Sequence, residues 1–334
     1  MKSTAKKYPN SHKVLTSNME QHAQPYILAL GEPLMELSAL EQGCLSSVNQ
    51  FLTGFGGDAS NFAVAAGRSG GNVGMLTTLG DDQFGDAFMT MWQREGVDTS
   101  HVRRDPQAPT GLYLIARAPG RHDFTYYRRG SAASRMAPDN LPEEAIRKAG
   151  LLHVTGVTQG ISSGACDTAF QAMRMAREAG VTISYDPNFR PALWPLSRAR
   201  AIIHESIALA DLVFPSMEEA SLMLGVTDPE LALQQYLDMG SAVVVLKLGP
   251  GGALIGNGEN RIHIDPIEVE AVDASGAGDT LAGAFAAAYL EGRPLEWCGR
   301  FAVAAAGLST LGLGCVGPIP DRETIYGHMQ GSSE

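Results

Sequence analysis

The second half of the 334-residue chain alternates short, uniformly apolar segments with longer amphipathic ones. The apolar segments lack the polar–apolar alternation of half-exposed strands, as expected for strands that helices cover on both faces. The predicted strands are Leu151–Val154, Val181–Asp186, Leu212–Pro215 and Ala242–Leu246, and the predicted helices are Ser162–Glu178, Arg198–Leu209, Met217–Leu224 and Glu230–Met239. This order predicts a parallel α/β core with helices on both sides.

The first half adds core elements and two segments that do not suit such a core. The core elements are strands at Tyr26–Leu30 and Val73–Leu79 and helices at Asp58–Arg68 and Gln83–Arg94. The other segments are β-like stretches at Leu34–Ser38 and Val48–Leu52, and a hairpin of Gly111–Arg117 and Asp123–Arg128 around Pro119-Gly120. We predict that residues 33–53 and 108–131 form a small β lid over a site at the carboxyl ends of the core strands. Residues 1–24 are polar and aperiodic and predict a flexible tail, which leaves 25–330 for the core.

The net charge of the chain restricts the kinds of molecules that it can bind. The chain has 25 Lys and Arg against 36 Asp and Glu, a net charge of −11, and no run of five basic residues. This disfavours nucleic acid and anionic membranes, although a few arginines in one pocket are enough to hold a small anion. Cys44, Cys166, Cys298 and Cys315 lack metal-ligand spacing, and no segment resembles a signal peptide or membrane span. We expect four buried free thiols and a cytoplasmic protein.

The strongest local motif is Asp273-Ala274-Ser275-Gly276-Ala277-Gly278-Asp279-Thr280. It follows a β-like segment, Ile267–Val272, and precedes a small-residue helix, Thr280–Leu290. The glycines allow close approach of a ligand, and the free N–H groups of the first helical turn form an anion hole. The loop lacks the Lys-Ser/Thr of a Walker A motif. Asp279 beside this hole suits a base in phosphoryl transfer, and its alternative role is a simple helix cap.

A second glycine motif, Gly56-Gly57-Asp58-Ala59-Ser60-Asn61, opens a helix earlier in the chain. Its Gly54-x-Gly56-x-x-Ala59 spacing also matches a dinucleotide-binding fingerprint. That fingerprint needs an acid about 20 residues further on and a preceding first core strand. Asp81 and Asp82 come too late, and the preceding strand is not the first of the core. The nicotinamide interpretation is therefore the weaker one.

Together the two motifs resemble the signatures of the ribokinase (PfkB) family of carbohydrate kinases over about residues 26–320. Leu79-Gly80-Asp81-Asp82-x-Phe84-Gly85, Ser216-x-x-Glu219 and Gly249-x-x-Gly252 add to the resemblance. It implies a ribokinase-like, doubly wound, mostly parallel sheet with a small β-sheet lid. It also implies transfer of the γ-phosphate of ATP, with Mg²⁺, to a sugar hydroxyl, with a monovalent cation as a further candidate cofactor.

The resemblance also implies site residues. Asp279 matches the catalytic base, and the anion hole corresponds to Gly276, Ala277 and Gly278. The sugar contacts correspond to Gly57 and Asn61, and the metal site corresponds to Glu219. The ATP site corresponds to Ser216, Gly249, Gly252, Gly276 and Gly278. The sequence departs from the family pattern at three positions. Ser216 replaces an Asn, Ser275 replaces a Thr, and Val303 stands where some relatives carry an Asn near the adenine.

Arginines and tyrosines suggest the kind of sugar. Tyr126 and Arg128 lie two apart in the second hairpin strand, opposite Tyr113, and Arg190 follows a core strand. Such a set suits a carboxylate-bearing sugar, because Arg pairs with carboxylates through two hydrogen bonds. Alternatively, Arg190 closes the Asp186 turn through an ion pair.

Two segments are similar to those of 2-keto-3-deoxygluconate kinases. They are Gly31-Glu32-Pro33-Leu34 and the run from Tyr126 to Ala133, whereas Asp186-Pro187-Asn188-x-Arg190 also occurs in fructokinases. The resemblance implies phosphorylation of 2-keto-3-deoxygluconate at its terminal hydroxyl, with Tyr113, Tyr126, Arg128 and Arg190 as sugar contacts. The alternatives are a fructokinase, another PfkB sugar kinase, or a non-catalytic sugar or nucleotide sensor. Exposed lid edges at Val48–Leu52 and Gly111–Arg117 predict a homodimer.

Overall fold

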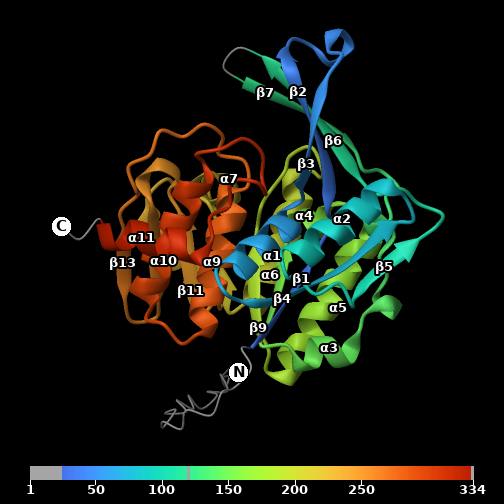
Figure 1. The fold of residues 1–334 in the computed structure, drawn as a ribbon. Coiled ribbons are helices and arrows are strands. Elements are labelled where there is room, and N and C mark those ends of the chain that lie inside the picture. The colour runs from blue at the N-terminus through green and yellow to red at the C-terminus, as the bar shows by residue number, and fades with distance from the viewer. Residues whose placement is uncertain (1–24, 119–120, 332–334) are drawn as a thin grey trace.

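The computed structural model describes residues 25–118 and 121–331 (Figure 1). The predicted tail, residues 1–24, and the Pro119-Gly120 turn lie outside this range. The strands are β1 Tyr26–Leu30, β2 Leu34–Gln42, β3 Phe51–Gly56, β4 Asn72–Gly80, β5 Val102–Asp105, β6 Leu112–Ala118, β7 Arg121–Tyr127, β8 Leu151–Thr155, β9 Thr182–Asp186, β10 Leu212–Val213, β11 Val243–Lys247, β12 Ala253–Asn257 and β13 Arg261–Ile264. The α-helices are α1 Asp58–Arg68, α2 Gln83–Arg94, α3 Glu143–Lys148, α4 Gly156–Gly160, α5 Ser163–Ala179, α6 Leu196–Leu209, α7 Met217–Leu224, α8 Pro229–Asp238, α9 Ala277–Leu290, α10 Leu295–Ser309 and α11 Arg322–Gly331.

A nine-stranded sheet forms the core, in the order β13-β12-β11-β10-β9-β8-β1-β4-β5. The pairs from β11 to β5 are parallel, and β12 and β13 add an antiparallel end that the sequence analysis did not predict. Helices lie on both faces of this sheet (Figure 1). The predicted α/β core with a mostly parallel sheet is confirmed.

Alternate side chains of the strands enter two separate apolar layers. In β1, Ile27 and Ala29 pack in a layer with residues of α1, α2, α9 and α10, whereas Leu28 and Leu30 pack on the other face with residues of α5, α6 and α8. Because successive strand residues point to opposite faces, a strand between two layers has to be apolar throughout. This requirement explains the uniformly apolar segments of the sequence.

Helices α1 and α9 pack closely, although they come from opposite ends of the chain. Gly283 of α9 makes this approach possible, because a Cβ there would lie 2.5 Å from the Phe62 carbonyl oxygen and 2.9 Å from Ala65 Cβ. Both helices begin at the edge of the sheet where β9 and β11 end. The N-termini of two helices therefore meet at one place.

A separate four-stranded sheet, ordered β3-β2-β6-β7, projects from the core (Figure 1). Its β2–β6 pair is parallel and the other pairs are antiparallel. The predicted edge at Gly111–Arg117 is wrong, because β6 lies inside the sheet between β2 and β7. The predicted edge at Val48–Leu52 is displaced, since β3 begins only at Phe51. The edges are β3 and β7.

Three further predictions are wrong. Ile267–Val272 forms no strand. The apolar run Val303–Ala306 followed by Gly307 predicts a short helix interrupted at that glycine, whereas α10 continues through it. Gly307 packs against Ile267, whose Cδ1 would lie 2.6 Å from an added Cβ, so close packing favours glycine inside this helix. Cys44 is exposed, while the other cysteines are buried as expected. Within residues 25–118 and 121–331, no helix is long and apolar enough to cross a membrane.

Candidate active site

Two cavities lie on either side of the N-terminus of α9. One, of about 310 Å³, is lined by Asp279 together with residues of α1 and of the small sheet. The other, of about 600 Å³, is lined by Ala277 and Gly278 together with Lys247 and residues of α10. We call them the polar cavity and the apolar cavity. The first turn of α9 thus forms part of the wall of both.

The polar cavity contains every residue that was predicted to contact the sugar. These residues are Gly57, Asn61, Tyr113, Tyr126, Arg128, Arg190 and Asp279, and Gly276 lies with them. Gly57 has a φ of +93°, and a Cβ there would collide with the carbonyl oxygen of Glu32. Only glycine suits this position.

Asp279 lies at the base of the polar cavity, and two amides hold its carboxylate. Asn61 Nδ2 donates to Asp279 Oδ2 at 2.9 Å, and Asn188 Nδ2 approaches Oδ1 at 3.4 Å. The carboxyl group of Asp58, at the first position of α1, also contacts the Asn188 amide, at 3.3 Å. Asn61 Oδ1 is buried and accepts no hydrogen bond in the described part of the chain. A ligand hydroxyl could satisfy this acceptor.

The proton affinity of Asp279 is unusually high. Burial and the neighbouring Asp58 carboxylate raise its pKa to about 7, against the opposing effects of the Asn61 hydrogen bond and the positive charge of Lys247. Burial in a low-dielectric site disfavours the charged carboxylate, and a second negative charge disfavours it further. A carboxylate poised near neutral pH is suited to accept a proton. Asp279 lies inside the first turn of α9, and Gly276 is the N-cap, so the simple cap interpretation does not apply.

A buried ion pair lies beside Asp279. Lys247 Nζ, at the end of β11, lies 2.6 Å from Asp186 Oδ2, at the end of β9. Burial raises the pKa of Asp186 to about 6, although Lys247 counteracts this effect. Burial alone would lower the pKa of Lys247, but the carboxylates of Asp186 and Glu219 raise it above its usual value. Lys247 therefore stays charged at the junction of the two cavities.

The loop before α9 leaves backbone donors free. Gly276 has a φ of +75°, and the Ala277 N–H donates to the Ala274 carbonyl oxygen at 3.2 Å. The N–H groups of Gly278 and Asp279 have no acceptor within the described ranges. A Cβ on Gly278 would lie 3.4 Å from Lys247 Nζ, so this glycine faces the ammonium group. Free amides, a helix N-terminus and a cation together form a site for an anion.

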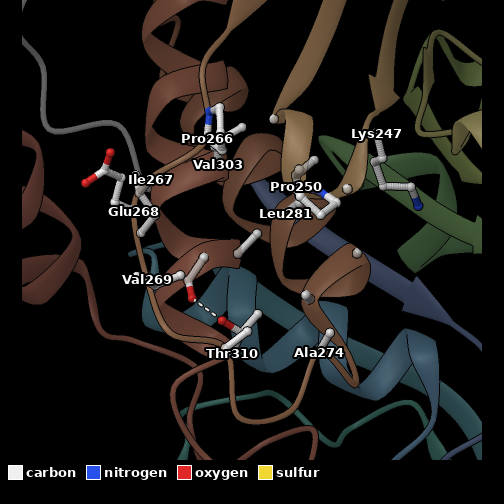
Figure 2. A pocket seen from close by; sticks show the side chains of 17 residues that line it. Lys247, Pro250, Pro266, Ile267, Glu268, Val269, Ala274, Leu281, Val303 and Thr310 are labelled. Atoms are coloured by element: carbon white, nitrogen blue, oxygen red, sulfur yellow. Dashed lines mark hydrogen bonds between the residues drawn. The ribbon is translucent and has the colours of Figure 1, made fainter. Parts of the chain in front are cut away.

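The apolar cavity contains Gly249 and Gly252, both predicted to lie beside the nucleotide, and also Val303. Figure 2 shows Lys247 on one side of this cavity and Ile267 and Glu268 on the other. The Thr310 hydroxyl, which also lines it, already donates to the Gly307 carbonyl oxygen at 2.7 Å. The space therefore offers apolar surface away from the amides of α9.

The two arginines of the polar cavity differ in their surroundings. Arg128 is buried and donates through Nε to Glu32 Oε2 at 2.7 Å, and its Nη2 forms an ion pair with the same carboxylate. Arg190 is exposed, and among the described residues it makes no ion pair; its Nη1 lies 3.4 Å from the Phe189 carbonyl oxygen. The alternative that Arg190 closes the Asp186 turn through an ion pair is wrong, because Lys247 fills that role. Arg190 is the uncompensated cation at the mouth of the cavity.

The small sheet places two tyrosines in the polar cavity. Tyr113 and Tyr126 face each other across β6 and β7 with ring centroids 5.7 Å apart. The Tyr113 hydroxyl donates to Glu36 Oε2 at 2.5 Å, and burial raises its pKa. Tyr126 is partly exposed, and the centroid of its ring lies 5.7 Å from the Arg128 guanidinium carbon, within cation–π range. Tyr113 thus forms a fixed wall, and Tyr126 lies nearer to solvent.

Ser216 and Glu219 line neither cavity. They form a capping box at the start of α7, in which the Ser216 Oγ accepts from the Glu219 N–H at 3.2 Å and the Glu219 carboxylate accepts from the Ser216 N–H at 2.8 Å. The other Glu219 oxygen accepts from the Phe189 N–H at 2.6 Å. No cluster of three or more potential metal ligands occurs in the described ranges. Both Glu219 oxygens accept hydrogen bonds from protein donors, and the metal role of Glu219 and the ATP role of Ser216 stay predictions.

Sequence reasoning missed four charged or amide groups of the site, and each had a usable signal. Glu32 follows the first core strand, and Lys247 ends another strand with a charge in an otherwise apolar run. Asp58 stands inside the second glycine motif, and Asn188 inside the segment that supplied Arg190. The carboxyl ends of parallel strands meet at one edge, so such positions are candidates for a site.

Comparisons with known proteins agree with this geometry. A model of the pfkB family carbohydrate kinases matches residues 24–322. The chain is 38% identical over 287 residues to a 2-dehydro-3-deoxygluconokinase of Thermoproteus tenax, covering 84% of this chain and 87% of the relative. It is 34% identical over 303 residues to a 2-dehydro-3-deoxygluconokinase of Bacillus subtilis, covering 89% of this chain and 93% of the relative. The solved structure of a fructokinase with bound ATP from Xylella fastidiosa superposes with a TM-score of 0.84 at 25% identity, covering 93% and 100%. The chain belongs to the PfkB family of carbohydrate kinases.

Proposed function

We propose that the protein is an ATP-dependent kinase of 2-keto-3-deoxygluconate, the compound also called 2-dehydro-3-deoxygluconate. The observation that carries this proposal is the position of Asp279, at the first helical turn that forms part of both cavities. The polar cavity takes the sugar acid and the apolar cavity takes the nucleotide. The named activity of the relatives from Thermoproteus tenax and Bacillus subtilis supports the choice of sugar.

In the proposed reaction a sugar hydroxyl attacks the γ-phosphorus of ATP. The new O–P bond forms as the bond to the β-phosphate oxygen breaks, ADP leaves, and the hydroxyl proton passes to Asp279. The free N–H groups of Gly278 and Asp279 and the Lys247 ammonium stabilise the charge on the transferring group. Mg²⁺ would accompany ATP on its phosphates, and we assign it no protein ligand.

We further propose that Arg190 binds the substrate carboxylate. It is the cation of the polar cavity that has no acidic partner among the described residues, whereas Glu32 compensates Arg128. Arg128 then fixes the wall of the cavity and orients Tyr126. The small sheet, which we predicted in the segments 33–53 and 108–131 and whose strand β3 extends to Gly56, acts as the lid of a catalytic core formed by residues 25–330.

Fructose is the second candidate substrate. The Arg128–Glu32 pair leaves one uncompensated arginine, and the solved fructokinase shares the fold. Turnover of 2-keto-3-deoxygluconate, fructose, ribose and adenosine with ATP decides between them. A clear preference for fructose overturns the sugar-acid proposal. Tight ligand binding without turnover of any of them would indicate the third candidate, a sensor.

Assembly and location are also proposals. The open edges of the small sheet, β3 and β7, support a homodimer that pairs through them. Sedimentation of the purified protein tests this. The unpaired Cys44, Cys166, Cys298 and Cys315 and the use of ATP support a cytoplasmic location. The proposed small-molecule partners are the sugar acid and ATP, and the net charge of −11 argues against nucleic acid and membranes.

A further inference from the structure

Asn188 lies where three carboxyl groups of the site converge, and the proposed reaction assigns it no step. Its side-chain amide lies 3.3 Å from Asp58 Oδ2 and 3.4 Å from Asp279 Oδ1. Its backbone N–H donates to Asp186 Oδ1 at 3.1 Å. The residue is buried and lines the polar cavity. Through its side chain and its backbone N–H, this one residue therefore connects α1, the start of α9 and the end of β9.

The backbone of Asn188 is in an unfavourable conformation. Its φ is +34°, and within the described ranges it is the sole non-glycine residue with a positive φ. Asn tolerates this region better than most residues, but glycine adopts it without steric cost. The turn after Pro187 alone would therefore favour glycine. Strained backbone tends to occur where a side chain is needed in a particular place.

The amide is chemically suited to hold two carboxylates. An Asn side chain carries two N–H donors, so one amide can donate to two acceptors at once. Asp58 is itself fixed, because its Oδ1 accepts from the Ala59 N–H at 2.8 Å. The other oxygen of Asp279 is held by Asn61 at 2.9 Å. With contacts on both oxygens, the carboxyl plane of Asp279 is restrained.

We propose that Asn188 is a positioning residue, which uses Asp58 as a fixed anchor to orient the Asp279 carboxylate toward the substrate hydroxyl. This role rests on the proposed kinase function. The 3.3 and 3.4 Å contacts are longer than typical hydrogen bonds, and catalytic hydrogen bonds often tighten only when substrate binds. Asn188 itself need not touch the reacting atoms.

Asn188→Gly is the decisive variant, because glycine adopts the positive φ of the turn and removes the side chain with its amide. We expect kcat to fall about 100-fold, the effect of misplacing a reacting group by about 1 Å. The KM for ATP should stay within about twofold, and the melting temperature should not fall. Asn188→Ala should lose as much activity and also stability, since alanine disfavours the positive φ. A kcat within about threefold of wild type in the glycine variant would overturn the proposal.

Asp58→Asn gives a second readout that a merely structural role would not move. The charged and titratable groups facing Asp279 are Asp58 on α1, Asp186 at the end of β9, Lys247 at the end of β11 and the Cys315 thiol. Removing one negative charge should move the acidic limb of kcat/KM down by roughly one pH unit. Asp238→Asn, the same change at an exposed position at the end of α8, is the matched control and should leave the limb in place.

The outcomes separate the two proposals. A wild-type chain that phosphorylates no sugar overturns both the kinase function and the positioning role. Suppose instead that the wild-type chain phosphorylates the sugar, that Asn188→Gly keeps its kcat, and that Asp58→Asn leaves the acidic limb of kcat/KM in place. That result overturns only the positioning role. A slow glycine variant with a shifted limb in Asp58→Asn supports it.

Discussion

The polar and apolar cavities share one helical turn but are lined by different kinds of chemical groups. In the polar cavity, charged side chains such as Asp58, Arg128 and Asp279 are held by other protein groups before any ligand binds. In the apolar cavity, Leu281 and Val303 provide surface, and the polar groups beside the start of α9 are backbone N–H groups and Lys247.

This difference indicates where selectivity should arise. Fixed donors and acceptors reject a ligand that leaves them unpaired, whereas apolar surface distinguishes ligands weakly. We therefore expect substitutions in the polar cavity to have large effects on catalysis and sugar use. Substitutions at the apolar end of the other cavity should have small effects, confined to ATP.

The largest effect is expected for Asp279→Asn. The amide has nearly the shape of the carboxylate but cannot accept the proton, so kcat should fall by about 10²- to 10⁴-fold. Steady-state kinetics measures this fall, and titration calorimetry with the sugar should show that binding is largely kept. Turnover near the wild-type rate would show that another group is the base.

Arg190→Met should raise the KM for 2-keto-3-deoxygluconate by about 10- to 100-fold. A hydrogen bond to a charged group contributes about 1.5–3 kcal/mol, and about 1.4 kcal/mol corresponds to a factor of ten. The KM for ATP should not change, and any residual activity on fructose should change little. A parallel rise in the KM for ATP would contradict the separation of the two cavities.

The pH dependence of kcat/KM should show an about tenfold fall toward acidic pH. Because the pKa of Asp279 is raised to about 7, the base is protonated below that pH and ionised above it. kcat/KM, which reports the free enzyme, should therefore rise with pH and be about tenfold below its plateau at about pH 6. A profile that stays flat across this range would remove Asp279 from the rate-determining proton transfer.

The smallest effect is expected for Val303→Ala. The substitution removes two CH₂ equivalents. Val303 also packs against the core, so we count one of them toward the nucleotide; its loss costs about 0.8 kcal/mol, which corresponds to about a fourfold rise in the KM for ATP. The KM for the sugar should stay the same, which makes this variant the counterpart of Arg190→Met. A rise of about 100-fold in the KM for ATP would mean that Val303 contributes far more to ATP binding than an apolar contact does.

The sequence predicted the core, and it predicted an anion-binding helix N-terminus beside Asp279, because both features depend on local patterns. Strands between two helical layers have to be apolar throughout, and a helix N-terminus that binds an anion needs glycine at fixed positions. Asp279 could be assigned in this way, whereas Gly57 and Asn61 were assigned from the resemblance to the PfkB family. Their meeting in one cavity follows from the position of all three at the edge where parallel strands end.

Features that depend on distant neighbours were not predictable in this way. Gly307 would weaken an isolated helix, and only its contact with Ile267 explains why α10 continues through it. β6 lies inside its sheet because β2, far earlier in the chain, pairs with it. The pairing of Lys247 with Asp186 joins two strands whose common edge no local pattern reveals.

The close packing of α1 and α9 through Gly283 has a consequence for folding. Asn61 and Asp279 are 218 positions apart, yet they form a hydrogen bond at the start of these two helices. During synthesis the polar cavity can acquire its base only after nearly the whole core has left the ribosome, since domains fold as their chain emerges. Contacts of such sequence separation form late and slowly. Recovery of sugar phosphorylation during refolding should therefore lag behind the recovery of helical circular dichroism.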